Sequence, residues 1–140
     1  MGYSFVDHTA DVAADLTGRT LGELFQSAGQ ALTDTITDIS RVQSLVTQSV
    51  TLESGSAEDL LVDWLNELLY RFEVQDMLFA DATVTVEERE PRWMLSASVT
   101  GERFDASRHP IRVLVKSATY HALALTQDAG VWRTRVVFDI

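Results

Sequence analysis

The sequence predicts an α+β fold, with a mostly antiparallel sheet and two main helices packed on one face in two layers. Two amphipathic helical patterns, at residues 20–37 and 56–72, are flanked by segments rich in β-branched and aromatic residues. The second half contains successive strand-like segments, with no regular alternation of strand and helix, which favours antiparallel pairing. The length of 140 residues is that of one ordinary domain, so we expect residues 1–140 to form a single domain.

The clearest single element is an amphipathic helix over residues 56–72. Its apolar side chains recur at helical spacing: Leu61, Trp64, Leu65, Leu68 and Phe72. Ser56, three residues before Asp59, is typical of a capped helix start. Glu67 and Arg71 have the i,i+4 spacing of a favourable ion pair. The acidic side of this helix has two interpretations, a solvated face or a docking surface for a basic partner.

Two strand-like segments and another helix precede this element. Residues 3–6 and 12–17 carry apolar and β-branched side chains on either side of a polar turn, which predicts two strands. Thr20-Leu-Gly-Glu23 is a capping box, and apolar residues follow it at helical spacing, so we expect a helix over residues 20–37. Residues 42–53 are rich in Val, Thr and Leu and predict a strand.

A run of strands is predicted after the second helix. The segments concerned are residues 78–88, 93–101, 111–125 and 131–138. The charged residues 89–92 predict a hairpin loop between the first two segments, and Asp128-Ala-Gly130 predicts a turn into the last one. Residues 111–125 mix β-branched with small side chains. We expect one or two strands there, with a helical turn at residues 117–120 as the alternative.

The net charge of −10 is unevenly distributed along the chain. Residues 1–88 carry 16 acidic and 3 basic side chains, whereas residues 89–140 carry 5 acidic and 8 basic ones. Because nucleic-acid affinity depends mainly on clustered Lys and Arg, we expect no stable direct binding of nucleic acid. Five arginines of the second half form either a modest basic patch or a scattered solvating set: Arg89, Arg92, Arg103, Arg108 and Arg112.

Composition also excludes several classes of protein. The chain has no cysteine, which excludes disulfides, thiolate metal sites and cysteine nucleophiles. Its apolar runs are far shorter than the roughly 18 residues that span a bilayer, and its start has no signal-peptide pattern. We therefore expect a cytoplasmic protein with no membrane association.

Conventional catalytic signatures do not occur in the sequence. There is no G-x-S-x-G, P-loop or H-E-x-x-H pattern. The three histidines, His8, His109 and His121, lack zinc-type spacing. We expect them in a turn, in a loop before proline and in a strand, respectively. The alternative for His8 is a role in a metal or catalytic site.

Carboxylates near the two ends of the chain are the best candidates for a site. Asp11 stands at the edge of an early strand, and Asp139 and the terminal carboxylate of Ile140 share the last two residues. If the first and last strands are neighbours, these charges gather and must either raise a pKa or bind a cation. All-oxygen ligands select calcium, magnesium or manganese. The alternative is that all three are ordinary loop and tail carboxylates.

Five separated segments together resemble the archease family, in the family's order. They are Asp7-His-Thr-Ala-Asp11-Val, Leu60-Leu-Val-Asp-Trp-Leu-Asn-Glu-Leu-Leu-Tyr70, Phe104-Asp with His109-Pro110, Thr119-Tyr-His121, and Arg135-Val-Val-Phe-Asp139-Ile140. The resemblance spans nearly the whole chain and implies a small α+β domain.

The resemblance implies an accessory protein and not an enzyme. Archeases assist RtcB-type RNA ligases, which join a 2′,3′-cyclic phosphate or 3′-phosphate end of RNA to a 5′-hydroxyl end in tRNA splicing and RNA repair. They promote transfer of GMP from GTP to the ligase's active-site histidine. The family's metal site, seen with calcium, matches Asp11, Asp139 and Ile140 in this sequence. The resemblance therefore implies one divalent cation, calcium, with manganese or magnesium as alternatives.

Two other functions are compatible with the residues. One is a metal-dependent phosphoester hydrolase that uses His8, Asp11 and Asp139. The other is a chaperone-like or nucleic-acid-binding module that uses the arginines of the second half, and it predicts salt-sensitive RNA binding. The acidic balance of the chain argues against the second. We expect a monomer that docks transiently on the ligase.

Overall fold

The computed structural model describes residues 2–6 and 11–140. Within these residues the elements follow one another in this order: β1 (Gly2–Val6), β2 (Asp11–Gly18), α1 (Leu21–Ile36), a short 3-10 helix η1 (Ile39–Arg41), β3 (Val46–Ser54), α2 (Ala57–Gln75), β4 (Met77–Arg89), β5 (Arg92–Arg103), β6 (Ser117–Thr119), β7 (Thr126–Asp128) and β8 (Val131–Asp139). None of the helices in this described part combines the length and apolar character needed to cross a membrane.

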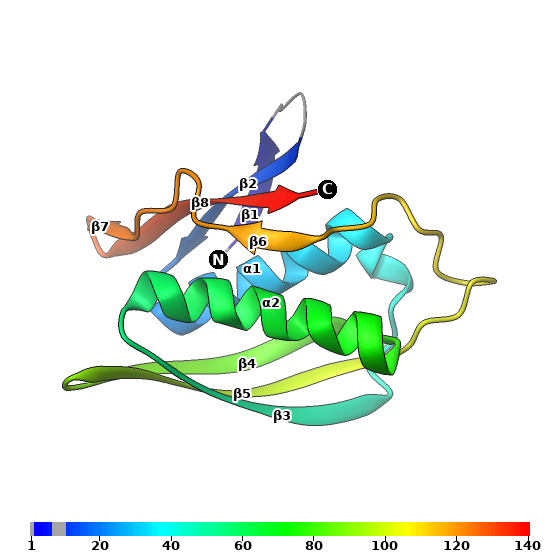
Figure 1. Cartoon of the computed structure of the whole chain (residues 1–140), viewed down its shortest axis with the longest axis horizontal. Helices are drawn as coiled ribbons and strands as arrows, with labels where there is room; N and C mark the ends of the chain where they lie inside the picture. The colour runs from blue at the N-terminus through cyan, green and yellow to red at the C-terminus, as the bar shows by residue number, and fades with distance from the viewer. Residues whose placement is uncertain (1, 7–10) are drawn as a thin grey trace.

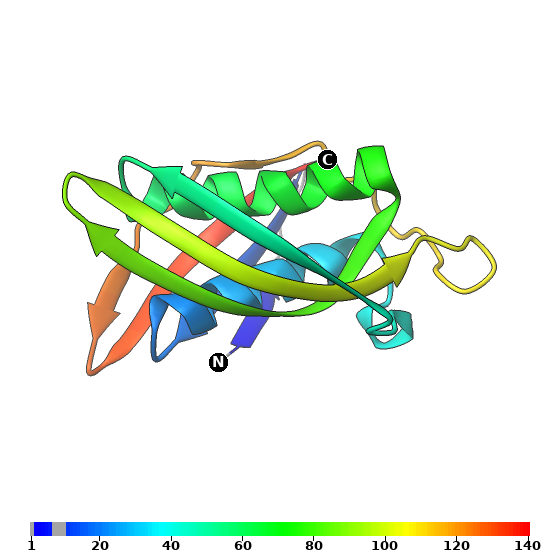
Figure 2. The same cartoon turned by 90° about the horizontal axis from the view of Figure 1, so that it is seen from below.

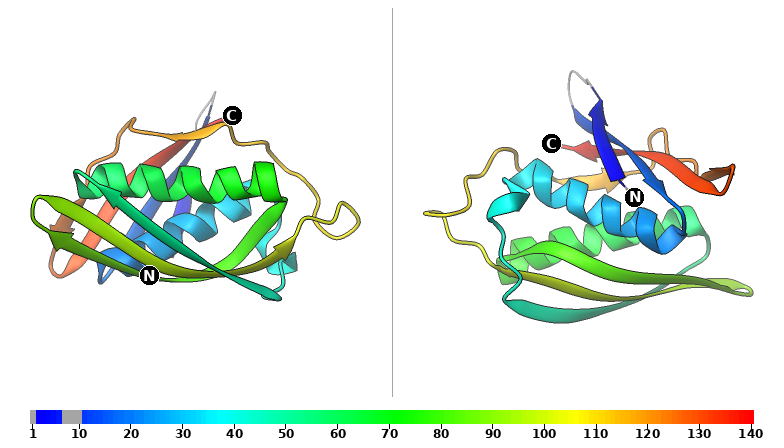
Figure 3. Two further views of the ribbon diagram at one scale, coloured as in Figure 1. Left: turned by 60° about the horizontal axis from the view of Figure 1, so that its bottom comes forward. Right: turned by 180° about the vertical axis from the view of Figure 1, so that it is seen from behind.

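The strands form two sheets, and the two α-helices lie between them (Figure 1). One sheet has the order β1-β2-β8-β6, with β7 also paired to β8, and the other has the order β3-β5-β4. Every strand pairing that the structure describes is antiparallel. The α+β class, the antiparallel pairing and the two main helices are therefore confirmed. The layering differs from the expected two layers, because a sheet covers each side of the helices (Figure 3).

The helices begin where the capping patterns predict. The Thr20 hydroxyl accepts the Glu23 N–H at 3.1 Å, and the Ser56 hydroxyl accepts the Asp59 N–H at 3.0 Å. Each bond satisfies a backbone donor that has no partner within the first helical turn. Trp64 is fully buried between the layers, and its indole Nε1 donates to the Phe25 carbonyl of α1 at 2.8 Å. A buried indole N–H without a partner would be costly, so this bond fixes how the helices pack.

The polar side of α2 binds other parts of the same chain. Asp59 accepts a hydrogen bond from the Tyr120 hydroxyl, Glu58 accepts one from the Leu125 N–H, and the Asn66 side chain accepts one from the Ala118 N–H. The i,i+4 pair expected on this side is present, with Arg71 Nε 2.7 Å from Glu67 Oε2. Part of this side is thus covered by β6 and the following loop. This side is therefore not wholly solvated, and docking of a basic partner on its exposed part, which includes Asp63, stays a prediction.

Residues 111–125 are mostly irregular, and only Ser117–Thr119 forms a strand. The expectation of one or two longer strands is therefore wrong for most of the segment, and His121 lies in a turn. The physical reason is that the backbone of its first part is bound by the end of α1 instead of by a neighbouring strand. The Arg112 N–H donates to the Ile36 carbonyl at 2.8 Å, at the C-terminal end of α1. Val115 of this segment still packs inward and is only 5% exposed, whereas Ile111 is 40% exposed.

The β3-β5-β4 sheet has a core-facing side and an outer side (Figure 2). Register places a block of small hydroxyl residues on its outer side: Thr47, Ser49, Thr51, Thr83, Thr85, Ser96, Ser98 and Thr100. β3 pairs with β5 along one edge, and no strand of the described chain pairs with its other edge. β3 begins four residues later than the expected start of its strand at residue 42, because η1 and its C-cap occupy residues 39–42.

Candidate metal site at the end of the first sheet

Asp11 and Asp139 lie directly opposite each other, at one end of the ladder between β2 and β8. Directly opposite residues in an antiparallel pair project to the same face, with Cβ atoms about 4.5–5.5 Å apart. The structure therefore brings together the two aspartates that the sequence singled out. Their role as metal ligands stays a prediction.

The register that pairs these aspartates is fixed by the apolar residues between them. Val12 is paired with Phe138, and Ala14 with Val136. Ala14, Val136 and Phe138 belong to the hydrophobic core, and Phe138 is fully buried. A slip of one residue would move this apolar set to the opposite face, so burial of the core holds Asp11 and Asp139 opposite each other on the outer face.

A third strand adds a hydroxyl group to the same row. Ser117 of β6 is paired with Asp139 on the edge of β8 that faces away from β2. The Lys116 N–H donates to the Asp139 carbonyl at 2.7 Å and holds the start of β6 against the end of the chain. The row across β2, β8 and β6 is therefore Asp11, Asp139 and Ser117. Sequence reasoning missed Ser117, because nothing in residues 111–125 indicated which three of them pair with β8.

The donors at this end of the sheet suit a hard divalent cation. Carboxylate and hydroxyl oxygens are the ligands that calcium, magnesium and manganese prefer. Two aspartates alone are too few: no group of three or more His, Cys, Asp or Glu side chains in residues 2–6 and 11–140 is arranged to hold a metal ion. The terminal carboxylate of Ile140 would be the third anionic ligand, and the Ile140 side chain is exposed. His8, the other expected participant, lies outside the described residues.

The next charged row on this face is already neutralised. Asp15 is paired with Arg135, and the guanidinium binds both carboxylate oxygens, with Nε 2.8 Å from Oδ1 and Nη2 3.2 Å from Oδ2. The Asp15 carboxylate raises the pKa of Arg135. Because both of its oxygens are engaged, Asp15 is not available as a further ligand for a cation at Asp11 and Asp139.

A second polar cluster, missed from the sequence, is buried where the irregular segment leaves β5. Glu102 and His109 are 3% and 1% exposed, and Glu102 binds the guanidinium of Arg108 and the N–H of Gln43. The hydrogen bond from Arg108 lowers the pKa of Glu102 to about 2. Burial acts in the opposite direction, whereas the hydrogen bonds with Gln43 and His109 also lower this pKa. His109 occupies a loop before proline, as expected. The cluster anchors residues 104–110 to β5.

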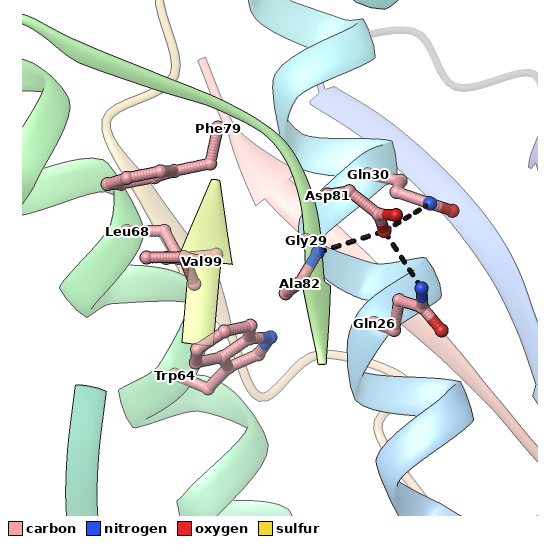
Figure 4. Close-up of a pocket in the computed structure, with 9 residues that line it drawn as sticks. All are labelled: Gln26, Gly29, Gln30, Trp64, Leu68, Phe79, Asp81, Ala82 and Val99. Carbon is pink, nitrogen blue, oxygen red and sulfur yellow. Dashed lines mark hydrogen bonds between the residues drawn. The ribbon is translucent and has the colours of Figure 1, made fainter. Parts of the chain in front are cut away.

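The hollow between α1, α2 and β4 is too small for a ligand (Figure 4). Its cavity volume is about 10 Å³, which is at the lower limit for one water molecule. Beside it, Asp81 accepts hydrogen bonds from the side chains of Gln26 and Gln30, at 2.8 and 3.2 Å. This hollow is a small packing defect next to a polar clamp between α1 and β4.

Four of the five arginines considered as a basic patch are engaged in separate ion pairs. The pairs are Arg89 with Glu87, Arg92 with Glu53, Arg108 with Glu102 and Arg112 with Asp34. They lie in a hairpin, in the irregular segment and beside α1, which corresponds to the scattered set and not to a patch.

Comparisons with known proteins give one consistent result. A family model described as the archease protein family (MTH1598/TM1083) matches residues 3–140. Protein archease of Methanosarcina barkeri is 35% identical over 139 residues, which cover 99% of this chain and 95% of the relative. Protein archease of Methanopyrus kandleri is 34% identical over 140 residues, which cover both chains fully.

Two solved structures share the fold. The solution structure of protein 1598 of Methanobacterium thermoautotrophicum has a TM-score of 0.84 and 29% identity, and the match covers 99% of each chain. The crystal structure of a Thermotoga maritima protein, described as an archease and possible chaperone, has a TM-score of 0.61 and 20% identity over 96% of this chain and 94% of that one. The second similarity concerns the fold alone.

Proposed function

This chain belongs to the archease family, and on that premise we propose that it is an accessory protein that activates an RtcB-type RNA ligase. Its role would be to promote GTP-dependent guanylylation of the ligase, so that the ligase turns over repeatedly. The protein would act without catalysing a reaction of its own. The family membership supports this proposal, and one feature of the structure supports the site through which it would act.

That feature is the direct pairing of Asp11 with Asp139 at an end of the first sheet. We infer that these carboxylates and the terminal carboxylate of Ile140 bind one divalent cation, calcium, with manganese or magnesium as alternatives. The ligands come from the two ends of the chain, and the core residues beside them fix their register. Such a site is preorganised, since little reorganisation is needed when the cation binds.

The placement of this site suits action on another protein. Asp139 and Ile140 are both exposed and lie at the end of the last strand. A bound divalent cation would supply positive charge that can orient and neutralise a triphosphate. Asp11 and Asp139 would hold that charge at the tip of the molecule, where it can reach the ligase's reacting groups at the required geometry.

The test is single-turnover labelling of a purified RtcB-type ligase by radiolabelled GTP, with substoichiometric amounts of this protein. We expect faster formation of ligase-GMP with the wild type and none of this stimulation with Asp11→Asn. Asp15→Asn is the matched control, because it makes the same charge change on the same face of the same strand. Normal stimulation by Asp11→Asn would refute the proposed site, and no stimulation by the folded wild type would refute the function.

Cation binding is tested separately, without the ligase. We expect calcium to raise the thermal midpoint of the wild type, because a ligand that binds only the folded state stabilises it. The rise should disappear in Asp139→Asn and in a variant with Gly-Ser added after Ile140, which moves the terminal carboxylate away. An unchanged calcium response in both variants would place the cation elsewhere.

A further inference from the structure

A hollow of about 250 Å³ lies on the first sheet, far from the aspartate site. Arg133, Thr17 and Thr126 are among the residues that line it. Arg133 lies six residues before Asp139 along β8, which corresponds to about 20 Å at the usual rise of a strand. The hollow and the aspartates therefore occupy opposite ends of the sheet.

Register places the three lining residues in one row. Arg133 of β8 is paired with Thr17 of β2 on one side and with Thr126 of β7 on the other. Directly opposite residues share a face, and Arg133 has the same parity as Asp139, so the row projects from the outer face. Two hydroxyl groups thus flank one guanidinium group.

The electrostatics of this row favour an anion. Arg133 forms no ion pair with any residue of the described chain, including Asp128 on the neighbouring strand. Asp15, which also lines the hollow, is already bound through both carboxylate oxygens by Arg135. Arg19, which follows β2 and is exposed, is likewise without an ion pair in the described residues. Because Gly18 is paired with Trp132, Arg19 and Arg133 both lie at this end of the sheet, where they carry positive charge without an ion-pair partner among the described residues.

The chemistry of the row matches a phosphate group. A guanidinium group presents N–H donors in a planar fork that fits two oxygens of a phosphate, and threonine hydroxyls can donate to the remaining oxygens. The volume is below the range of about 300–1,000 Å³ that is typical of sites for drug-sized ligands. We propose that the hollow binds a single phosphate group, held by Arg133 and by the Thr126 hydroxyl. The phosphate belongs either to a mononucleotide or to the backbone of an RNA strand.

This inference is independent of the proposed function. It rests on Arg133, Arg135 and Thr126, none of which takes part in the aspartate site. If the ligase did not respond to the protein, the proposed phosphate site would not be affected. If the hollow did not bind phosphate, the proposed role in guanylylation would not be affected. Together, the two sites would give one face of the sheet a cation at one end and an anion-binding group at the other.

The experiment is an NMR titration of the wild-type protein that follows its arginine Nε–H signals. One arm adds inorganic phosphate, a second adds GMP and a third adds a ten-nucleotide RNA, all at low ionic strength. We expect the Arg133 signal to shift in a saturable manner. In Arg133→Gln we expect the affinity, followed at the Thr126 amide, to fall at least tenfold. Arg103→Gln is the matched control, because Arg103 is also exposed and unpaired among the described residues but lies at the end of β5.

The outcomes distinguish a mononucleotide phosphate from an RNA backbone phosphate, and both from the absence of a phosphate site. If phosphate and GMP bind as tightly as RNA does, with each affinity expressed per phosphate group, the hollow is a mononucleotide site. If RNA binds much more tightly than phosphate and GMP, and its affinity falls with salt as expected for one or two phosphate contacts, the natural ligand is the RNA backbone. Thr126→Val should weaken binding less than Arg133→Gln does, while leaving the fold intact. No saturable shift at Arg133 with any of the three ligands, or equal losses in Arg133→Gln and Arg103→Gln, would overturn the proposal.

Discussion

The buried side chains of Glu102 and His109 are joined by a hydrogen bond of 3.1 Å between Oε2 and Nε2. The other ring nitrogen, Nδ1, accepts the N–H of Asp105 at 2.9 Å. Because Nδ1 is an acceptor, Nε2 carries the proton and donates to Glu102. The carboxylate also accepts from Arg108 and from the Gln43 backbone, so one buried side chain connects β5, the segment before β3 and the start of the irregular segment.

Glu102→Gln should therefore destabilise the fold. The neutral amide loses the charge-assisted bond to Arg108 and turns an acceptor into a donor that faces other donors. We expect the free energy of unfolding to fall by about 1–3 kcal/mol, measured by urea denaturation. Glu87→Gln is the control, since Glu87 pairs with Arg89 on an exposed hairpin and should matter little. Equal effects of the two substitutions would contradict the anchoring role of Glu102.

The same carboxylate predicts a dependence of stability on pH. Its pKa falls from the ordinary value of 4.5 to about 2 in the folded protein. A lowered folded pKa contributes stability above the unfolded value and loses it as pH decreases. We expect the wild type to lose stability between pH 4.5 and about 2, and Glu102→Gln to lose less over that interval. Parallel stability curves for the two proteins would show that Glu102 is not responsible.

Two glycines of α1 predict opposite results for the same substitution. A methyl group at Gly22 would lie 2.1 Å from the Val84 carbonyl oxygen, which belongs to backbone and cannot move aside. At Gly29 the nearest atom is Leu68 Cδ1 at 3.2 Å, the end of a flexible side chain beside the small hollow. Alanine is favoured over glycine in a helix by about 1 kcal/mol. We expect Gly29→Ala to be neutral or stabilising by up to that amount and Gly22→Ala to be clearly destabilising, in the same thermal unfolding assay. Destabilisation by both would mean that Leu68 cannot shift.

The turn between β7 and β8 contains a residue in an unfavourable backbone conformation. Ala129 has φ 51° and Gly130 has φ 76°, as in a two-residue turn that needs positive φ at both positions. Alanine is strained there and glycine is not. We expect Ala129→Gly to raise the free energy of unfolding by up to about 1 kcal/mol and Gly130→Ala to lower it. The opposite order in equilibrium unfolding would mean that the turn has a different conformation in solution.

Local patterns in the sequence were sufficient for both helices and most of the strands, and they singled out two aspartates that the structure places opposite each other. The caps at Thr20 and Ser56 and the turn at residues 128–130 depend on neighbouring residues only, and all three are confirmed. Asp11 and Asp139 could be singled out because Asp11 begins one strand and Asp139 ends another, and the core-facing apolar residues next to them set their register.

The remaining features depend on contacts between distant segments. The residue patterns of β2 and β5 identify each as a strand but do not show whether the two share a sheet, so the division into two sheets was missed. Residues 111–125 have the composition of a strand, but the end of α1 and Asn66 of α2 bind their backbone. Ser117 and Arg133 gain their neighbours only because β8 pairs with three different strands.

The unpaired edge of β3 affects how the protein behaves at high concentration. Along this nine-residue strand, the backbone donors and acceptors that point away from β5 form an edge on which another chain could pair, and the only charged side chain of the strand is Glu53. What keeps copies apart is their shared negative charge, which salt screens and which vanishes near the isoelectric point of about 4.5. We therefore expect this protein to stay dispersed in dilute neutral buffers of low ionic strength. Near the isoelectric point, we expect aggregation to begin with pairing between the β3 edges of different copies.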